Sequence, residues 1–280
     1  MTKRKKDRIS AAIKDVVSGL MDRVMDKVLV QDPFVKEKHR SAKPLYAALV
    51  PDEIFKGSHF ERRFVTPFGG VWEKLAKVVA LEFHGNCLMG HTITGTVCEG
   101  SLRRIQEVLN ALEHKQNGKE RVKPDWEKEI KYIKDGTGEL ISTSVVCDIF
   151  IESKKTKKKY AFEMKAPLPN SDQTKVSKEK MFKLLAMQPQ KVDNAFYALP
   201  YNPYGKKVDY AWSFPLRWFD MKMDASVLIG DEFWNLIGGR GTYSKFIKEV
   251  NSLGAGYKER VYREFLGIEP PCDSNDGVLR

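Results

Sequence analysis

The sequence predicts an α/β (α+β) fold, with a mixed β-sheet flanked by helices and a helical N-terminal region. Two observations support this prediction. Apolar residues recur at helical spacing over residues 8–30, and from about Thr143 β-branched residues follow one another in short runs. Helices, then strands, then mixed elements are typical of one α/β or α+β domain, and 280 residues with 42% apolar side chains suffice for its core.

The first third of the chain predicts three helices. The first covers 8–30, and the second has an apolar face over 72–83 after a loop at 66–70. Residues 85–100 are rich in Gly and Thr and predict a loop or short strands. Ser101 is the expected N-cap of the third helix.

A β-hairpin is the clearest feature of the middle of the chain. Its predicted strands are Val145–Ile151 and Lys159–Lys165, and the basic segment Lys154–Lys159 forms the turn, which we interpret as solvated rather than as a phosphate contact. Pro167 ends the second strand, and a helix is expected from Ser177. The remaining predicted elements are strands at 194–199 and 225–229 and helices at 231–237 and 242–253.

The composition indicates which class of partner and which cellular compartment to expect. Forty-eight Lys and Arg against thirty-seven Asp and Glu give a net charge of +11, which favours nucleic acid as the partner, with an anionic membrane second. No apolar run approaches the ~18 residues of a membrane span, and charges interrupt any secretory signal. Four scattered cysteines without a C-x-x-C pair predict a reduced, cytoplasmic protein.

Asp148, Glu163 and Lys165 are the candidate catalytic residues. Glu163 and Lys165 share one strand face, and the hairpin places Asp148 beside Glu163. Two adjacent carboxylates disfavour each other's ionised form unless a cation lies between them. Mg²⁺ prefers such oxygen ligands, and a neighbouring ammonium can orient an attacking water. The sequence therefore predicts a Mg²⁺ site held by Asp148 and Glu163.

The acid-x-lysine triplet is by itself a weak signal. It also begins at four other acids, which lie in charged or helical surroundings, whereas Glu163 interrupts an apolar strand. The alternative is a surface pair of Glu163 and Lys165 on an edge strand, with Asp148 there by chance. The four other triplets begin at Glu113, Glu129, Glu152 and Asp220.

These strands resemble the core of the PD-(D/E)XK nucleases, and longer strings resemble type II restriction endonucleases of the TdeIII-like group. The resemblance implies a restriction-endonuclease-like core and Mg²⁺-dependent double-strand cleavage of DNA at a short palindromic site, GGNCC-like, leaving 5′-phosphates. One departure is Cys147, which stands where the pattern has Pro. The strings that carry the resemblance are Phe60-Glu-Arg-Arg-Phe-Val-Thr-Pro-Phe-Gly69, Trp72-Glu73, Glu163-Met-Lys-Ala-Pro-Leu-Pro-Asn170-Ser-Asp-Gln173, Pro200-Tyr-Asn-Pro-Tyr204 and Gly230-Asp-Glu-Phe-Trp-Asn-Leu-Ile-Gly-Gly239.

The resemblance also implies a catalytic glutamate on the helix before the core strands, and Glu73 matches it. A salt bridge at the border of the helix's apolar face is the alternative role for Glu73. Asn170, Gln173 and Lys175 follow the catalytic strand and are candidates for DNA binding, because amides pair with adenine and Lys with guanine or phosphate. As turn and helix-start residues they equally need no function.

Three parts are predicted: an N-terminal helical region (1–60), the nuclease core with its recognition elements (61–255) and a C-terminal tail (256–280). Two cuts on antiparallel strands predict a homodimer on double-stranded DNA, without a membrane. Two alternative functions remain. One is a structure-specific nuclease of DNA repair or recombination, and the other is a basic DNA-binding protein without catalysis.

Overall fold

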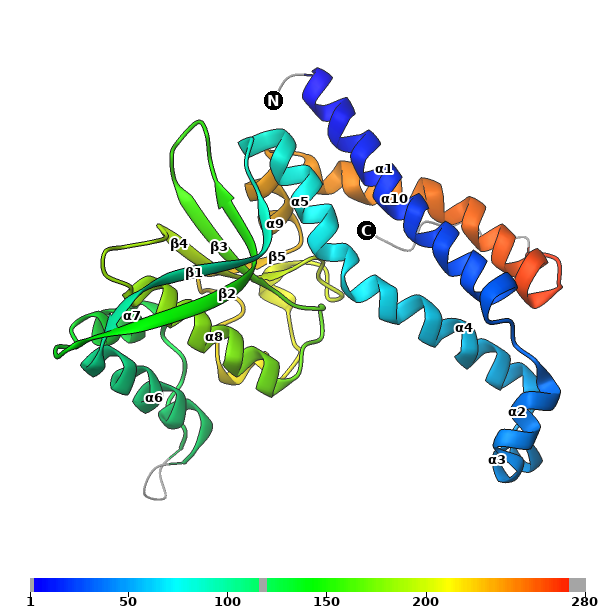
Figure 1. The fold of residues 1–280 in the computed structure, drawn as a ribbon, viewed down its shortest axis with the longest axis horizontal. Coiled ribbons are helices and arrows are strands. Elements are labelled where there is room, and N and C mark those ends of the chain that lie inside the picture. Colours follow the sequence, from blue (N-terminus) through cyan, green and yellow to red (C-terminus); the bar gives the residue numbers. More distant parts are fainter. Residues whose placement is uncertain (1–2, 116–119, 272–280) are drawn as a thin grey trace. The chain divides into compact units, whose positions relative to one another are not determined.

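The structure is a computed structural model, and it describes residues 3–115 and 120–271 (Figure 1). Within these residues the chain divides into two compact units. One holds residues 76–243 with residues 3–5, and the other holds 6–75 and 244–271. The three parts predicted from the sequence, divided at residues 60 and 255, were defined by their roles and not by their compactness. That division stays a prediction.

The first unit contains one five-stranded sheet and the helices packed on it. Strand order along the sheet follows the chain from β1 to β5; the pairs β1–β2 and β2–β3 are antiparallel, and β3–β4 and β4–β5 are parallel. The predicted mixed sheet flanked by helices is confirmed. Its strands are β1 (Leu88–Cys98), β2 (Leu140–Glu152), β3 (Lys159–Met164), β4 (Asn194–Leu199) and β5 (Val227–Ile229). The helices of this unit are α6 (Glu99–Glu113), α7 (Trp126–Lys134), α8 (Ser171–Ala186) and α9 (Asp231–Gly238), with the short 3₁₀ helices η2 (Lys207–Asp209) and η3 (Pro215–Arg217).

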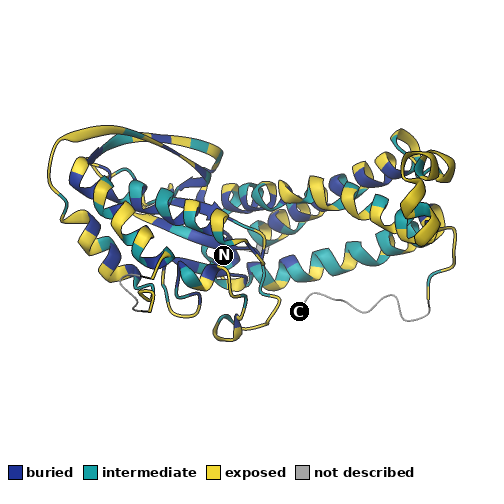
Figure 2. Ribbon diagram, turned by 90° about the horizontal axis from the view of Figure 1, so that it is seen from below, coloured by how far each residue is buried: buried dark blue, intermediate teal, exposed yellow. Residues whose placement is uncertain are grey.

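Helices cover the sheet because successive side chains of its strands point to opposite faces. Glu163 of β3 contacts Ser177 of α8, which defines one face. On the other face, Phe162 of β3 packs against Phe196 of β4 and Phe233 of α9. Buried residues gather along the central strands and on the helix sides turned to them (Figure 2). Charged groups inside β2 and β3 are therefore placed under α8.

Residues 88–98 form one strand of 11 residues, β1, in which Gly90 has a positive φ of 55°, so the expectation of a loop or short strands at 85–100 was wrong. Pairing with β2 along its length outweighs the glycines, and β-branched residues such as Ile93 and Val97 fill the buried positions. Gly95 has a packing reason, because a Cβ atom there would lie 3.0 Å from the sulfur of Met187. Gly95 thus allows close packing, whereas a Cβ atom at Gly90 would meet no neighbour, and Gly90 instead supplies a positive φ inside the strand.

Two predicted helix starts also need correction. Cys98 caps α6, and its Sγ accepts a hydrogen bond from the backbone N–H of Ser101, whose own hydroxyl donates to Ile133 instead. α8 begins at Ser171 rather than Ser177, because the Asn170 side chain caps it. In both cases a side chain earlier in the sequence than the predicted residue already binds a free N–H group of the first helical turn.

The second unit is helical. The apolar stripe predicted at 8–30 is buried, and α1 packs on α10, where Tyr257 donates to Asp22 and Lys14 pairs with Glu249. Its elements are α1 (Lys3–Asp26), the π-helix η1 (Lys27–Gln31), α2 (Lys36–Ala42), α3 (Pro44–Leu49), α4 (Asp52–Gly69), α10 (Thr242–Arg260) and the π-helix η4 (Val261–Leu266). α5 (Val71–His84) contains the junction to the first unit. The predicted loop at 66–70 is in fact the last turn of α4, which accommodates Pro67.

Two further findings concern the apolar length of the helices and the cysteines. Of the helices in residues 3–115 and 120–271, none is long and apolar enough to cross a membrane. Cys87, Cys98 and Cys147 are buried free thiols, and burial raises the pKa of Cys87 and of Cys147 to about 12. Cys272 lies outside the described residues.

Candidate active site

The C-terminal end of β3 lies beside the interior of β2, and this brings the two predicted carboxylates together. Ile149 pairs with Phe162 in the antiparallel ladder, so the next pair along the strands is Asp148 and Glu163. Asp148 Oδ2 accepts a hydrogen bond of 2.7 Å from the backbone N–H of Met164. The ladder and this bond fix the Asp148 side chain against the end of β3.

Lys165 follows the last residue of β3 and joins this pair. Its Nζ donates to Asp148 Oδ2 at 2.9 Å and to the carbonyl of Met164 at 2.9 Å, and it lies 3.6 Å from Glu163 Oε2. Both hydrogen bonds to Asp148 end on Oδ2. Oδ1 has no such bond to any described residue, and the side chain is 22% exposed. The structure therefore brings together the three residues selected from the sequence, and one carboxylate oxygen stays available.

Glu163 is the buried member of the site, with 1% of its surface exposed. Burial, and then the charge of Asp148, raise its pKa to about 7, while Lys165 and Lys180 act in the opposite direction. An apolar strand thus carries a carboxylate whose charged form needs cations. The alternative of an exposed edge pair does not agree with this burial.

Lys180 is the member that sequence reasoning missed. It projects from α8, and its Nζ donates to Glu163 Oε1 at 2.8 Å and to Oε2 at 2.9 Å. Ser177, one helical turn earlier, also donates to Glu163 Oε2, at 3.4 Å. The sequence offers Lys175, Lys178, Lys180 and Lys183 on this helix without a signal that selects one of them.

A second charged pair lies inside the same unit. Lys178 is fully buried, 2.6 Å from Glu129, and it also donates to the carbonyl of Trp218. The rings of Trp126, Phe182 and Phe219 surround its ammonium at 5.0–5.9 Å. Glu129 begins one of the competing acid-x-lysine triplets, and it lies in helix α7 as expected. Its carboxylate pairs with the buried Lys178 and thus has a structural role in the core.

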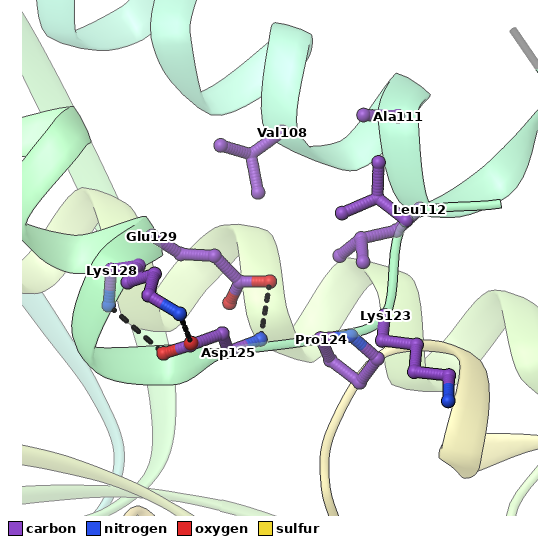
Figure 3. A pocket seen from close by; sticks show the side chains of 9 residues that line it. Val108, Ala111, Leu112, Lys123, Pro124, Asp125, Lys128 and Glu129 are labelled. Carbon is purple, nitrogen blue, oxygen red and sulfur yellow. Dashed lines mark hydrogen bonds and ion pairs between the residues drawn. The ribbon is translucent and has the colours of Figure 1, made fainter.

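An apolar pocket between α6 and α7 adjoins this pair, and Asp148 and Glu163 do not line it (Figure 3). It has a volume of about 370 Å³, and Val108 and Leu112 face Pro124 across it. Asp125 and Lys128 pair with each other at its rim, and the backbone N–H of Asp125 donates to Glu129. The pocket brings no reactive group to the candidate site.

The predicted DNA-binding residues have different surroundings. Asn170 uses its Oδ1 to cap α8, where it accepts from the N–H of Gln173 at 2.8 Å. Lys175 is partly buried and pairs with Glu113. The side chain of Gln173 is exposed. The two residues with structural partners are thus less available to DNA than Gln173.

Glu73 lies in the first turn of α5 and is partly buried. It belongs to the second unit, whereas Asp148, Glu163, Lys165 and Lys180 belong to the first. Its role is therefore untested by the geometry of the site, and it stays a prediction.

The donor set fits a hard divalent cation. Among the described residues, no three His, Cys, Asp or Glu side chains form a metal-binding group, so the site offers two carboxylates. Mg²⁺ keeps several waters and commonly binds through one or two carboxylates. The free Oδ1 of Asp148 and the unfavourable buried charge of Glu163 are both consistent with such an ion.

Comparison with known proteins identifies the family of the chain. The type II restriction enzymes HgiEI and HgiBI of Herpetosiphon aurantiacus are each 25% identical to the chain over 268 residues, which is 93% of this chain and 96% of theirs. HgiCII of the same organism is 25% identical over 228 residues, 80% of this chain and 82% of its own. The narrower TdeIII-like and PD-(D/E)XK assignments stay predictions. The model of the type II restriction endonuclease HinfI family matches residues 9–254, and the chain belongs to that family of endonucleases.

Proposed function

We propose that this endonuclease makes Mg²⁺-dependent double-strand breaks in DNA at a short palindromic site and leaves 5′-phosphates. The observation that supports this most is the convergence of Asp148, inside β2, with Glu163 and Lys165 at the C-terminal end of β3, where Glu163 is buried. A GGNCC-like site, implied by the TdeIII-like resemblance, is our starting hypothesis for the sequence cut.

In the proposed mechanism Asp148 and Glu163 hold the cation. Bound Mg²⁺ supplies Lewis acidity toward a phosphate oxygen and makes water more acidic. Lys165, anchored on Asp148 Oδ2, orients the attacking water, and the positive charge of its ammonium favours loss of the water's proton to solvent. The water attacks the phosphorus in line with the leaving 3′-oxygen, so the products carry a 5′-phosphate and a 3′-hydroxyl.

Residues outside this centre have supporting roles in the proposal. Glu73 tunes the site as an outer ligand or through a second cation. Gln173 is the best placed of the three DNA-binding candidates, because its side chain is exposed at the start of α8. Asn170 and Lys175 act by shaping this helix start, where the cap and the Glu113 pair hold them.

The partner is double-stranded DNA, and the active form is a homodimer in the cytoplasm. One set of Asp148, Glu163 and Lys165 cuts one phosphodiester, and two copies related by a two-fold axis match the antiparallel strands of a palindrome. The net charge of +11 for each chain supports binding to the duplex.

Incubation of supercoiled plasmid with the protein tests this function. Mg²⁺ or Mn²⁺ should give discrete bands, EDTA should abolish them, and Ca²⁺ should support binding without turnover. Asp148→Ala and Lys165→Ala should lose cleavage by several orders of magnitude yet stay folded and still shift DNA. Asp220→Asn is the matched control, because Asp220 begins another acid-x-lysine triplet but only accepts backbone hydrogen bonds in its turn.

Three outcomes would contradict the proposal. Full activity in excess EDTA rejects the metal site. Nicks that depend on DNA structure rather than sequence indicate a repair or recombination nuclease. Plasmid that is retarded but never cut under any divalent cation indicates that this chain binds DNA without the proposed chemistry.

A further inference from the structure

The candidate site is electrically balanced without a metal. When both are ionised, Asp148 and Glu163 carry two negative charges, and Lys165 and Lys180 carry two positive ones within 2.9 Å of a carboxylate oxygen. Each lysine has its own acid, because Lys165 lies 2.9 Å from Asp148 but 3.6 Å from Glu163. Glu163 therefore depends on Lys180 for a close positive charge.

The position of Lys180 resembles that of a bound cation. Its Nζ lies 2.8 Å from one carboxylate oxygen of Glu163 and 2.9 Å from the other. A cation that binds a carboxylate through both oxygens occupies this place, between the two oxygens and nearly equidistant from them. An ammonium and a metal ion cannot both lie there, because like charges at contact distance repel strongly in a site this buried.

We propose that Lys180 is a resident counter-ion of Glu163, which a divalent cation must displace, so that Lys180 sets the metal concentration the enzyme needs. This inference rests on the proposed metal role of Glu163. Lys180 is a positioning residue in this proposal: it acts through Glu163 and takes no part in the reaction itself.

The side chain of Lys180 is suited to such an exchange. It is 29% exposed, so its flexible stem allows the ammonium to turn toward water when the cation enters. Lys178 on the same helix contrasts with it, because that ammonium is fully buried and held by Glu129 and by Trp218. Of these two lysines on α8 only Lys180 combines a close bond to the site with a path to solvent.

Thermal unfolding of the full-length protein without DNA tests the proposal at pH 8.5. For each variant the Mg²⁺ concentration that gives half of the full metal-induced rise in Tm is measured. Lys180→Met removes the competing charge, and it should lower this concentration by roughly fivefold or more while lowering Tm in EDTA. Lys180→Gln should show the same shift and serves if the methionine variant folds poorly. Lys180→Arg keeps the charge and should stay within about twofold of the wild type.

Lys183→Met is the control, because Lys183 is 30% exposed on the same helix but pairs with Glu179 rather than with Glu163. Its metal requirement should equal that of the wild type. If Lys180→Met and Lys180→Gln need as much Mg²⁺ as the wild type or more, Lys180 only supports the structure and the inference is wrong. If Mg²⁺ does not raise the Tm of the wild type at all, the proposed metal role fails and this inference fails with it.

Discussion

Glu129 and Glu163 begin the same three-residue pattern, and both are buried beside a lysine of α8. They differ in what lies next to the pair. Aromatic rings enclose Lys178 beside Glu129, whereas Glu163 adjoins the partly exposed Asp148 and Lys165. Asp148 and Lys165 are 22% and 20% exposed, so water and a phosphate group can reach the second arrangement. A buried acid is thus a weak indicator of catalysis unless an open neighbour accompanies it.

Glu129→Ala tests this distinction. The substitution leaves the ammonium of Lys178 buried without its partner, so the free energy of unfolding should fall by about 3–5 kcal/mol. Urea unfolding measures this loss, and cleavage at low temperature, normalised to folded protein, should remain near the wild-type rate. If the folded variant is as inactive as Glu163→Ala, the catalytic acid has been assigned to the wrong strand.

Asp224 gives a pH dependence with a defined sign. Burial raises its pKa from 3.8 to about 6, so the folded state holds this proton more tightly than the unfolded chain does. Its contribution to stability is present below about pH 4 and is lost as the pH rises through 6. Asp224→Asn removes the titration and keeps an acceptor for the N–H of Asp220. The Tm of this variant minus that of the wild type should therefore grow by a few degrees between pH 4 and pH 7. A difference that stays constant over this range would falsify the assignment.

The sequence predicts Asp148, Glu163 and Lys165 because their proximity follows from local rules. Strand alternation fixes the face, and a short hairpin fixes the register between neighbouring strands. Lys180 could not be selected in this way. The rotation of α8 against the sheet decides which of its lysines turns inward, and that rotation depends on the packing of the whole unit.

At the scale of elements, the strands β3 and β4 and the start of α9 agree with the sequence pattern, whereas β1 and the first turn of α8 do not. Residues 194–199 and 231–237 have a clear period and a clear break at each end. β1 is specified by its partner instead, because β2 supplies the hydrogen bonds that offset its glycines. Long-range pairing is absent from the local pattern, which explains why β1 was missed. The first turn of α8 was missed for a local reason, because Asn170 caps the helix.

The start of α8 separates a structural role from a recognition role for Asn170. Asn170→Ala removes the cap and should lower the free energy of unfolding by about 1 kcal/mol, whereas Asn170→Asp keeps an acceptor and should preserve stability. Chemical denaturation measures both changes. If Asn170 only caps the helix, the aspartate variant also keeps the wild-type cleavage pattern. A changed or relaxed site in a stable Asn170→Asp protein would return Asn170 to the group that contacts bases.

At the scale of the molecule, the apolar stripe of α1 is already covered by the chain itself. α1 packs on α10 through Tyr257 and through the pair of Lys14 and Glu249. That stripe is therefore not a free surface for a second copy of the chain. From the sequence alone, an amphipathic helix without an assigned partner would suggest such a surface. The dimer expected from the chemistry must use other surfaces.

Sedimentation tests the dimer directly. At micromolar concentration the mass should be about twice the 32.0 kDa of the chain. Cleavage should convert supercoiled plasmid to the linear form without accumulating nicked circles. The affinity for DNA should fall steeply as salt rises, because basic side chains release counterions from the phosphates. A monomer that accumulates nicked circles before linear DNA contradicts the dimer and leaves the chemistry of each site intact.

The four charged residues of the site all come from one uninterrupted stretch, Asp148 to Lys180, which contains the β2–β3 hairpin and most of α8. This has a consequence for folding kinetics. Contacts between residues close in sequence form early, since little chain entropy is lost in closing short loops. The stretch should thus behave as one cooperative unit in hydrogen exchange, with the amides of β3 and α8 opening together. Substitutions there should slow folding more than they speed unfolding, because the candidate site is expected to form before β5 joins the sheet.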